Sequence, residues 1–73
     1  MRSYEVEYSY QCQGADGNVR WISGAEHACA RTAREAVDVV TRRYGPGLPG
    51  FRVDAVHRKT WGSWEAVPDR EWT

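Results

Sequence analysis

The chain has 73 residues, of which 10 are basic and 10 are acidic, so its formal net charge is zero. This length allows one small domain over residues 1–73, and the balanced charge argues against a protein that depends on phosphate contacts, because such proteins usually carry a basic excess. No apolar run approaches the roughly 20 residues that span a bilayer, and the N-terminal stretch has no apolar signal core, so we expect a cytoplasmic protein with no membrane partner.

The first predicted element is a strand over residues 3–12, SYEVEYSYQC, in which side chains alternate strictly between two faces. One face would carry Tyr4, Val6, Tyr8, Tyr10 and Cys12, and the other Ser3, Glu5, Glu7, Ser9 and Gln11. The GADGN segment that follows predicts a hairpin turn near Asp16–Gly17, and residues 19–31 would form the return strand. Gly24 interrupts the alternation of this return strand and indicates a bulge there.

The next predicted element is a helix over residues 33–44, with Thr32 as its N-cap and Glu35 completing a capping box. Gly45 and Pro46 predict its end, with Gly45 at the C′ position. At about 100° per residue, one stripe would face the sheet and comprise Ala33, Ala36, Val37, Val40 and Tyr44. The opposite face holds Arg34, Asp38, Thr41 and Arg42, so we interpret it as a solvated, charge-alternating face rather than a nucleic-acid recognition surface.

Residues 45–50, GPGLPG, match the glycine spacing of a dinucleotide-binding loop, but they end a helix and carry two prolines, so we expect no cofactor. A third strand is predicted over residues 51–60, with Phe51 and Val53 on one face and Arg52 and Asp54 on the other. WGSW is typical of a turn into a short fourth strand, WEAV. Residues 67–73 lack periodicity and could form an extended tail, with its tryptophan either on the sheet or exposed.

This order of elements predicts an α+β fold, β-β-α-β-β, with a small antiparallel sheet and one helix packed on one face of it. A right-handed crossover through the helix would place the third strand beside the first, which becomes central. The predicted hairpin holds Cys12 and Cys29 too far apart for a disulfide, which suits a reducing compartment.

The two histidines, His27 and His57, and the two cysteines do not have the spacing of zinc knuckles. A Cys29–histidine nucleophile lacks an evident orienting group, and Glu5 and Glu7 are typical of a solvated charge ladder rather than an acid–base pair. We therefore expect no enzyme activity and no metal, and a Cys/His enzyme or metal site is only a third hypothesis.

Four tryptophans are more than a small core beneath an alanine–valine helix needs, so at least two should lie on the open sheet face or in the C-terminal hairpin. They could form a minor core there, or an exposed patch of the kind that marks partner surfaces. The second interpretation predicts a small non-enzymatic protein-binding or self-associating module that acts through the open sheet face and the Trp-rich hairpin. The residues that would carry it are Trp21, Trp61, Trp64, Arg58, Lys59 and Arg20.

The alternative function is single-stranded nucleic-acid binding through the same tryptophans and basic residues. Zero net charge disfavours it. Glu5 and Glu7 on the open face also disfavour it, unless Arg52 and Arg58 neutralise them.

Overall fold

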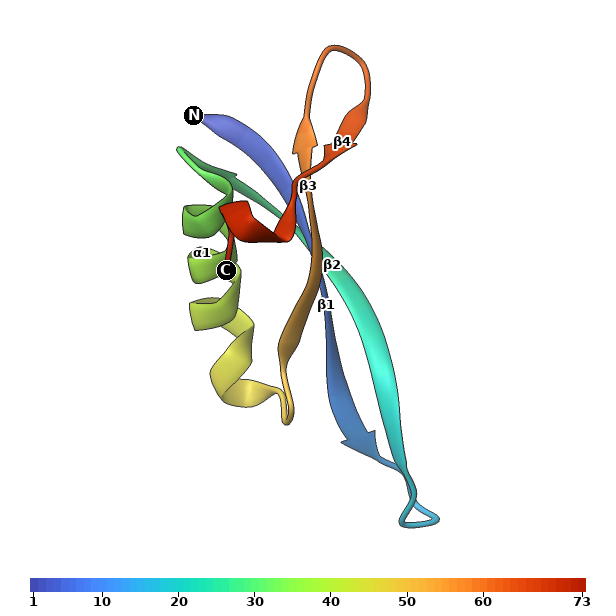
Figure 1. The fold of residues 1–73 in the computed structure, drawn as a ribbon. Coiled ribbons are helices and arrows are strands. Elements are labelled where there is room, and N and C mark those ends of the chain that lie inside the picture. Colours follow the sequence, from blue (N-terminus) through green and yellow to red (C-terminus); the bar gives the residue numbers. More distant parts are fainter.

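The computed structural model describes all 73 residues and contains one helix packed on one face of a four-stranded sheet (Figure 1). The strands are β1 Arg2–Gln13, β2 Val19–Ala30, β3 Arg52–Lys59 and β4 Trp64–Ala66, the helix is α1 Ala33–Tyr44, and the 3-10 turns are η1 Gly45–Gly47 and η2 Asp69–Glu71. The predicted α+β order is confirmed. All strand pairs are antiparallel in the order β2-β1-β3-β4, so β1 is central and β3 lies beside it, as expected.

Helix α1 begins and ends where the sequence predicts. The Glu35 amide donates to the Thr32 hydroxyl oxygen at 3.1 Å, which satisfies one of the free donors of the first turn. At the other end Gly45 has φ −53° and donates its amide to the Thr41 carbonyl, so it is not a left-handed C′ residue and the expected helix stop is wrong in this detail. The chain tightens into η1, whose first turn accommodates Pro46 because no amide donor is required there. No helix of the chain combines the length and the apolarity that crossing a bilayer requires.

The core lies between α1 and the sheet, with members from β1, β2 and β3 and with Val67 from the segment after β4. Its fully packed members are Tyr4, Val6, Ala30, Ala33, Ala36, Val40, Val56 and Val67. Tyr8 extends this core as the centre of an aromatic cluster, with its ring centroid 5.3 Å from Phe51, 5.5 Å from Tyr44 and 6.3 Å from Tyr10. The helix therefore contributes small residues and the sheet contributes the bulk, as the composition indicated.

The bulge of this sheet lies in β3, not in β2. The β1–β2 register runs without a break and pairs Tyr8 with Gly24, so the bulge expected at Gly24 is wrong. In the β1–β3 ladder Ala55 faces Glu7 but Val53 faces Tyr8, which leaves Asp54 as the extra residue. Gly24 is needed for another reason, because a Cβ there would lie 2.7 Å from the Tyr8 ring.

The C-terminal residues fold back onto the helix side of the sheet (Figure 1). The Val67 amide donates to the Val56 carbonyl at 2.9 Å, and the Val67 side chain is buried. Trp72 packs against the core from the turn that follows, so this indole belongs to the interior and residues 67–73 do not form an extended tail.

The β1–β2 hairpin extends well beyond α1, so the molecule measures 45 × 22 × 19 Å (Figure 1). Its turn forms where the sequence predicts: Gly17 has φ 81°, and the Gly14 amide donates to the Asn18 carbonyl at 2.9 Å. The part of the hairpin beyond the helix is a bare two-stranded ribbon. The half of β2 nearer the turn exposes three large apolar side chains, Val19, Trp21 and Ile22.

Candidate functional site

The face of the sheet turned away from α1 carries polar and aromatic side chains in register across the strands. Directly paired residues project from the same face of an antiparallel sheet, so the register defines this open face. Three rows cross it: His27–Glu5–His57, Ala25–Glu7–Ala55 and Ser23–Ser9–Arg52. The acidic side chains of β1 therefore lie in the middle of the face, and imidazoles flank Glu5 on both neighbouring strands.

Arg52 covers Trp21 at the end of the open face that lies toward the hairpin turn. Its guanidinium carbon is 4.1 Å from the centre of the Trp21 ring, within cation–π range. Its Nε donates to the buried Ser9 hydroxyl oxygen at 2.9 Å and to Asp54 Oδ1 at 3.1 Å. The Asp54 bulge thus orients the arginine over the indole, and sequence reasoning did not identify this pair.

Trp64 lies across the opposite end of the open face. It is paired with Lys59 in the β3–β4 ladder, and the Lys59 ammonium nitrogen is 5.1 Å from the centre of its ring. The same ring lies 5.3 Å, centroid to centroid, from His27 on β2. A shallow pocket of about 270 Å³ opens beside this contact, lined by Ser3, His27, Ala28, Cys29, Lys59 and Trp64.

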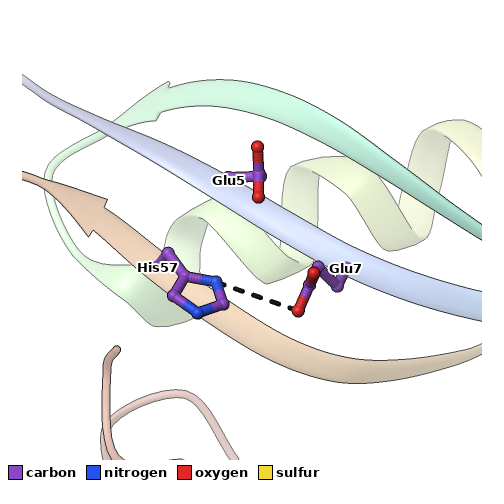
Figure 2. A group of neighbouring side chains, drawn as sticks. All are labelled: Glu5, Glu7 and His57. Atoms are coloured by element: carbon purple, nitrogen blue, oxygen red, sulfur yellow. Dashed lines mark ion pairs between the residues drawn. The ribbon is translucent and has the colours of Figure 1, made fainter. Parts of the chain in front are cut away.

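A cluster of histidine and carboxylate groups lies between the two indoles, and Figure 2 shows three of its members, Glu5, Glu7 and His57. His27 Nε2 is 3.0 Å from Glu5 Oε2, and His57 Nδ1 is 3.9 Å from Glu7 Oε2. One potential ligand atom from each of Glu5, Glu7 and His57 lies within 4.8 Å of the others. His57 Nδ1 is buried and has no hydrogen-bond partner, because the Glu7 oxygen is too distant to accept from it.

The structure divides the predicted partner-binding residues between two faces and one loop. Trp21, Trp64 and Lys59 are on the open face, and Trp61 is fully exposed in the β3–β4 loop. The two arginines lie on the helix side, because Arg20 is paired with Cys12 and Arg58 with Tyr4. The groups beside Glu5 on the open face are therefore the two histidines and not these two arginines.

Each of these two arginines has an acidic neighbour. Arg20 is 3.3 Å from Asp16 and Arg58 is 3.5 Å from Glu65. Hydrogen bonds from the amide and side chain of Asn18, together with Arg20, lower the pKa of the Asp16 carboxyl. Both basic groups are thus partly neutralised within the chain.

The two cysteines are free thiols at opposite ends of the β1–β2 hairpin, as predicted. Cys12 is paired with Arg20 near the turn, and Cys29 with Ser3 at the far end.

The hairpin turn contained a usable signal for part of this site. A β1–β2 loop over residues 14–18 pairs residue 5 with residue 27, so His27 could have been placed beside Glu5.

No protein-family model, curated protein or solved structure matches this chain. Its function is therefore inferred from its own residues and their geometry.

Proposed function

We propose that this chain is a non-enzymatic protein-binding module and that its partner is a second copy of itself, paired along the outer edge of β2. The supporting observation is that β2 is a 12-residue edge strand without proline or lysine, whose two charged residues, Arg20 and Glu26, both project from the helix side of the sheet. Such an edge is a template for another strand, and natural sheets usually protect it with those residues or with a covering element.

The hydrogen-bonding side of this edge follows from one contact of the neighbouring strand. The Gln11 amide donates to the Pro49 carbonyl at 2.7 Å, so it points away from β2, and Gln11 and Trp21 form a non-hydrogen-bonded pair. Because the β1–β2 register has no break, the alternation continues along the strand. The amides that point outward from the sheet therefore include those of Trp21, Ser23, Ala25 and His27.

The side chains beside this edge also favour association. Trp21 and Ile22 are 48% and 38% exposed on opposite faces of β2, next to the two-stranded end of the hairpin, which would be marginally stable alone. Trp64 brings a second open-face indole to the same edge through its contact with His27. A two-fold axis near Gly24 would set Trp21 of each copy opposite His27 of the other. Zero net charge means that two copies do not repel each other strongly.

A protein partner is better supported than single-stranded nucleic acid. Glu5 and Glu7 occupy the middle of the open face, while Arg20 and Arg58 project from the opposite face and are paired with carboxylates. Tryptophan emission titrated with a single-stranded oligonucleotide at low salt should stay unchanged. Quenching that weakens as salt rises would support the nucleic-acid alternative instead.

The size of the pockets and the state of the cysteines also bear on the function. The pocket beside His27, at about 270 Å³, is smaller than usual ligand sites, and the two larger hollows lie at residues 45–51 and in the β3–β4 loop, away from the histidine–carboxylate cluster, which favours a non-enzymatic role. The free thiols Cys12 and Cys29 favour a reducing, cytoplasmic setting.

Sedimentation equilibrium over a range of chain concentrations tests the self-association. We expect a monomer–dimer equilibrium for the natural chain and a monomer for Ser23→Pro, because proline removes an outward amide that β1 does not use. Ser23→Thr, which keeps the amide, is the matched control and should dimerise. A natural chain that remains monomeric at every concentration would refute the second copy as the partner.

A further inference from the structure

We propose that Glu5, Glu7 and His57 form a binding site for a divalent transition-metal ion of the Zn²⁺ class, with His27 positioning Glu5. This inference does not depend on the self-association proposed above, because all four residues belong to one chain and three adjacent strands. The spacing of the histidines and cysteines predicts no metal site, and the site proposed here uses carboxylates in place of the thiols.

The donor set selects the class of metal. One imidazole nitrogen with two carboxylate oxygens suits Zn²⁺, Co²⁺ or Ni²⁺, whereas Ca²⁺ and Mg²⁺ prefer oxygen ligands alone. Three protein ligands would leave one position of a tetrahedral ion open to water or to another group. The exposed carboxylates of Asp54, Glu65 and Glu71 have no imidazole in a comparable arrangement.

The geometry requires only side-chain adjustment. Ligand atoms around a tetrahedral Zn²⁺ lie about 3.4 Å apart, given metal–ligand bonds of about 2.1 Å. The three atoms present here already lie within 4.8 Å of one another. Paired strands hold the backbone of these residues, and both glutamate side chains keep partial exposure, at 28% for Glu5 and 46% for Glu7, so their χ angles can rotate inward.

A second observation points to a ligand at this place. His57 Nδ1 is buried without a hydrogen-bond partner, and such atoms are uncommon in folded proteins because their desolvation is not compensated. This atom faces the Glu7 carboxylate (Figure 2). A metal ion between the nitrogen and the oxygen would satisfy both.

His27 completes the surroundings of the site. Its Nε2 lies 3.0 Å from Glu5 Oε2, and Trp64 stacks on its ring. An imidazole N–H that donates to a ligating carboxylate holds that carboxylate in place. Loss of a hydrogen-bond partner of a metal ligand typically weakens metal binding by about 10- to 100-fold. His27 is therefore a positioning residue in this proposal, and the ring of Trp64 restrains it.

Calorimetric titration of the full chain with Zn²⁺ tests the site, in a Cys12→Ser/Cys29→Ser background that removes the competing thiols. We expect binding of about one ion per chain. Glu7→Gln and His57→Gln should each weaken it at least tenfold, while Glu65→Gln, an exposed carboxylate elsewhere, should not change it. Circular dichroism would verify that each variant folds.

Further variants separate the ligands from the positioning residue. His27→Ala should weaken binding about tenfold, and His27→Gln, which restores an N–H donor, should recover most of it. Co²⁺ should give visible absorption bands that disappear in His57→Gln. Ser23→Pro, which we expect to be monomeric, should keep its affinity for Zn²⁺. Absence of Zn²⁺ binding by the cysteine-free chain, or binding insensitive to Glu7→Gln, would overturn the proposal.

Discussion

The indole of Trp64 lies against the imidazole of His27, with 5.3 Å between ring centroids, although β4 and β2 are the two outer strands of the sheet. The side chain crosses the open face and joins the C-terminal hairpin to the edge at which we propose self-pairing. It also restrains the histidine that contacts Glu5. Loss of Trp64 should therefore affect both proposed binding properties.

Trp72 and Trp61 should differ sharply in their contribution to stability. Trp72 packs against the core, whereas Trp61 is fully exposed. In urea denaturation we expect Trp72→Ala to lower the free energy of unfolding by at least about 2 kcal/mol and Trp61→Ala to change it by less than about 0.5 kcal/mol. Trp72→Phe should be milder than Trp72→Ala, because phenylalanine keeps most of the buried aromatic volume; both variants remove the buried indole N–H that has no acceptor. Equal effects of the two alanine variants would contradict this account of the C-terminal segment.

Gly24→Ala should destabilise the chain although alanine is usually tolerated in a strand. The added Cβ would lie 2.7 Å from the Tyr8 ring, and this ring is held by Tyr44 and Phe51. We expect a loss of about 1–3 kcal/mol in the free energy of unfolding. Gly47→Ala is the control, since nothing lies within 4 Å of a Cβ there. An unchanged free energy of unfolding in Gly24→Ala would show that the Tyr8 ring moves aside freely.

Arg52→Lys should cost stability despite keeping the charge. Lysine has no Nε–H in the position that donates to the buried Ser9 hydroxyl, and it loses the planar contact with Trp21. We expect about 1–2 kcal/mol lower stability in urea denaturation, together with a shift in tryptophan emission. Arg42→Lys, on the exposed face of α1, should leave both quantities unchanged.

The stability of the fold should fall at high pH through Tyr44. A hydrogen bond to the Glu26 carboxylate, aided by burial, raises the pKa of the Tyr44 phenol above its ordinary value of about 10. The folded state then retains a proton that the unfolded chain releases. This contribution to stability is complete below about pH 10 and is lost as pH rises through the raised pKa.

Tyrosinate absorbance measured as a pH titration tests this assignment. The difference between the titration curves of the natural chain and of Tyr44→Phe should show one phenol with a raised midpoint. Glu26→Gln should move that midpoint back toward about pH 10. An unchanged midpoint in Glu26→Gln would show that the carboxylate is not the cause.

Local chemistry made the elements of this fold predictable. The Thr32 cap, the Asp16–Gly17 turn and the alternation of β1 depend on neighbouring residues, and all three form as expected. The bulge at Asp54 has no such signature, because it arises from how β3 meets β1. The same bulge sets the position of His57 opposite Glu5, so this half of the histidine–carboxylate cluster could not be predicted.

Trp21 and Trp64 lie on the open face, as predicted, whereas Arg20 and Arg58 lie on the opposite face. Arg20 adjoins Trp21 in one strand, so alternation alone places the two side chains on opposite faces. The arginine that does reach Trp21, Arg52, comes from a strand on the other side of β1. Such contacts depend on the pairing of strands that are distant in sequence, and this pairing cannot be predicted from a local sequence pattern.

Amide hydrogen exchange along β2, followed residue by residue by NMR at low and high chain concentration, tests the self-pairing most directly. The inward amides of Ile22, Gly24 and Glu26 bond to β1 and should be protected at both concentrations. The outward amides of Ser23 and Ala25 should exchange rapidly in dilute solution and become protected as concentration rises. Rapid exchange of these outward amides at every concentration would contradict the proposed pairing.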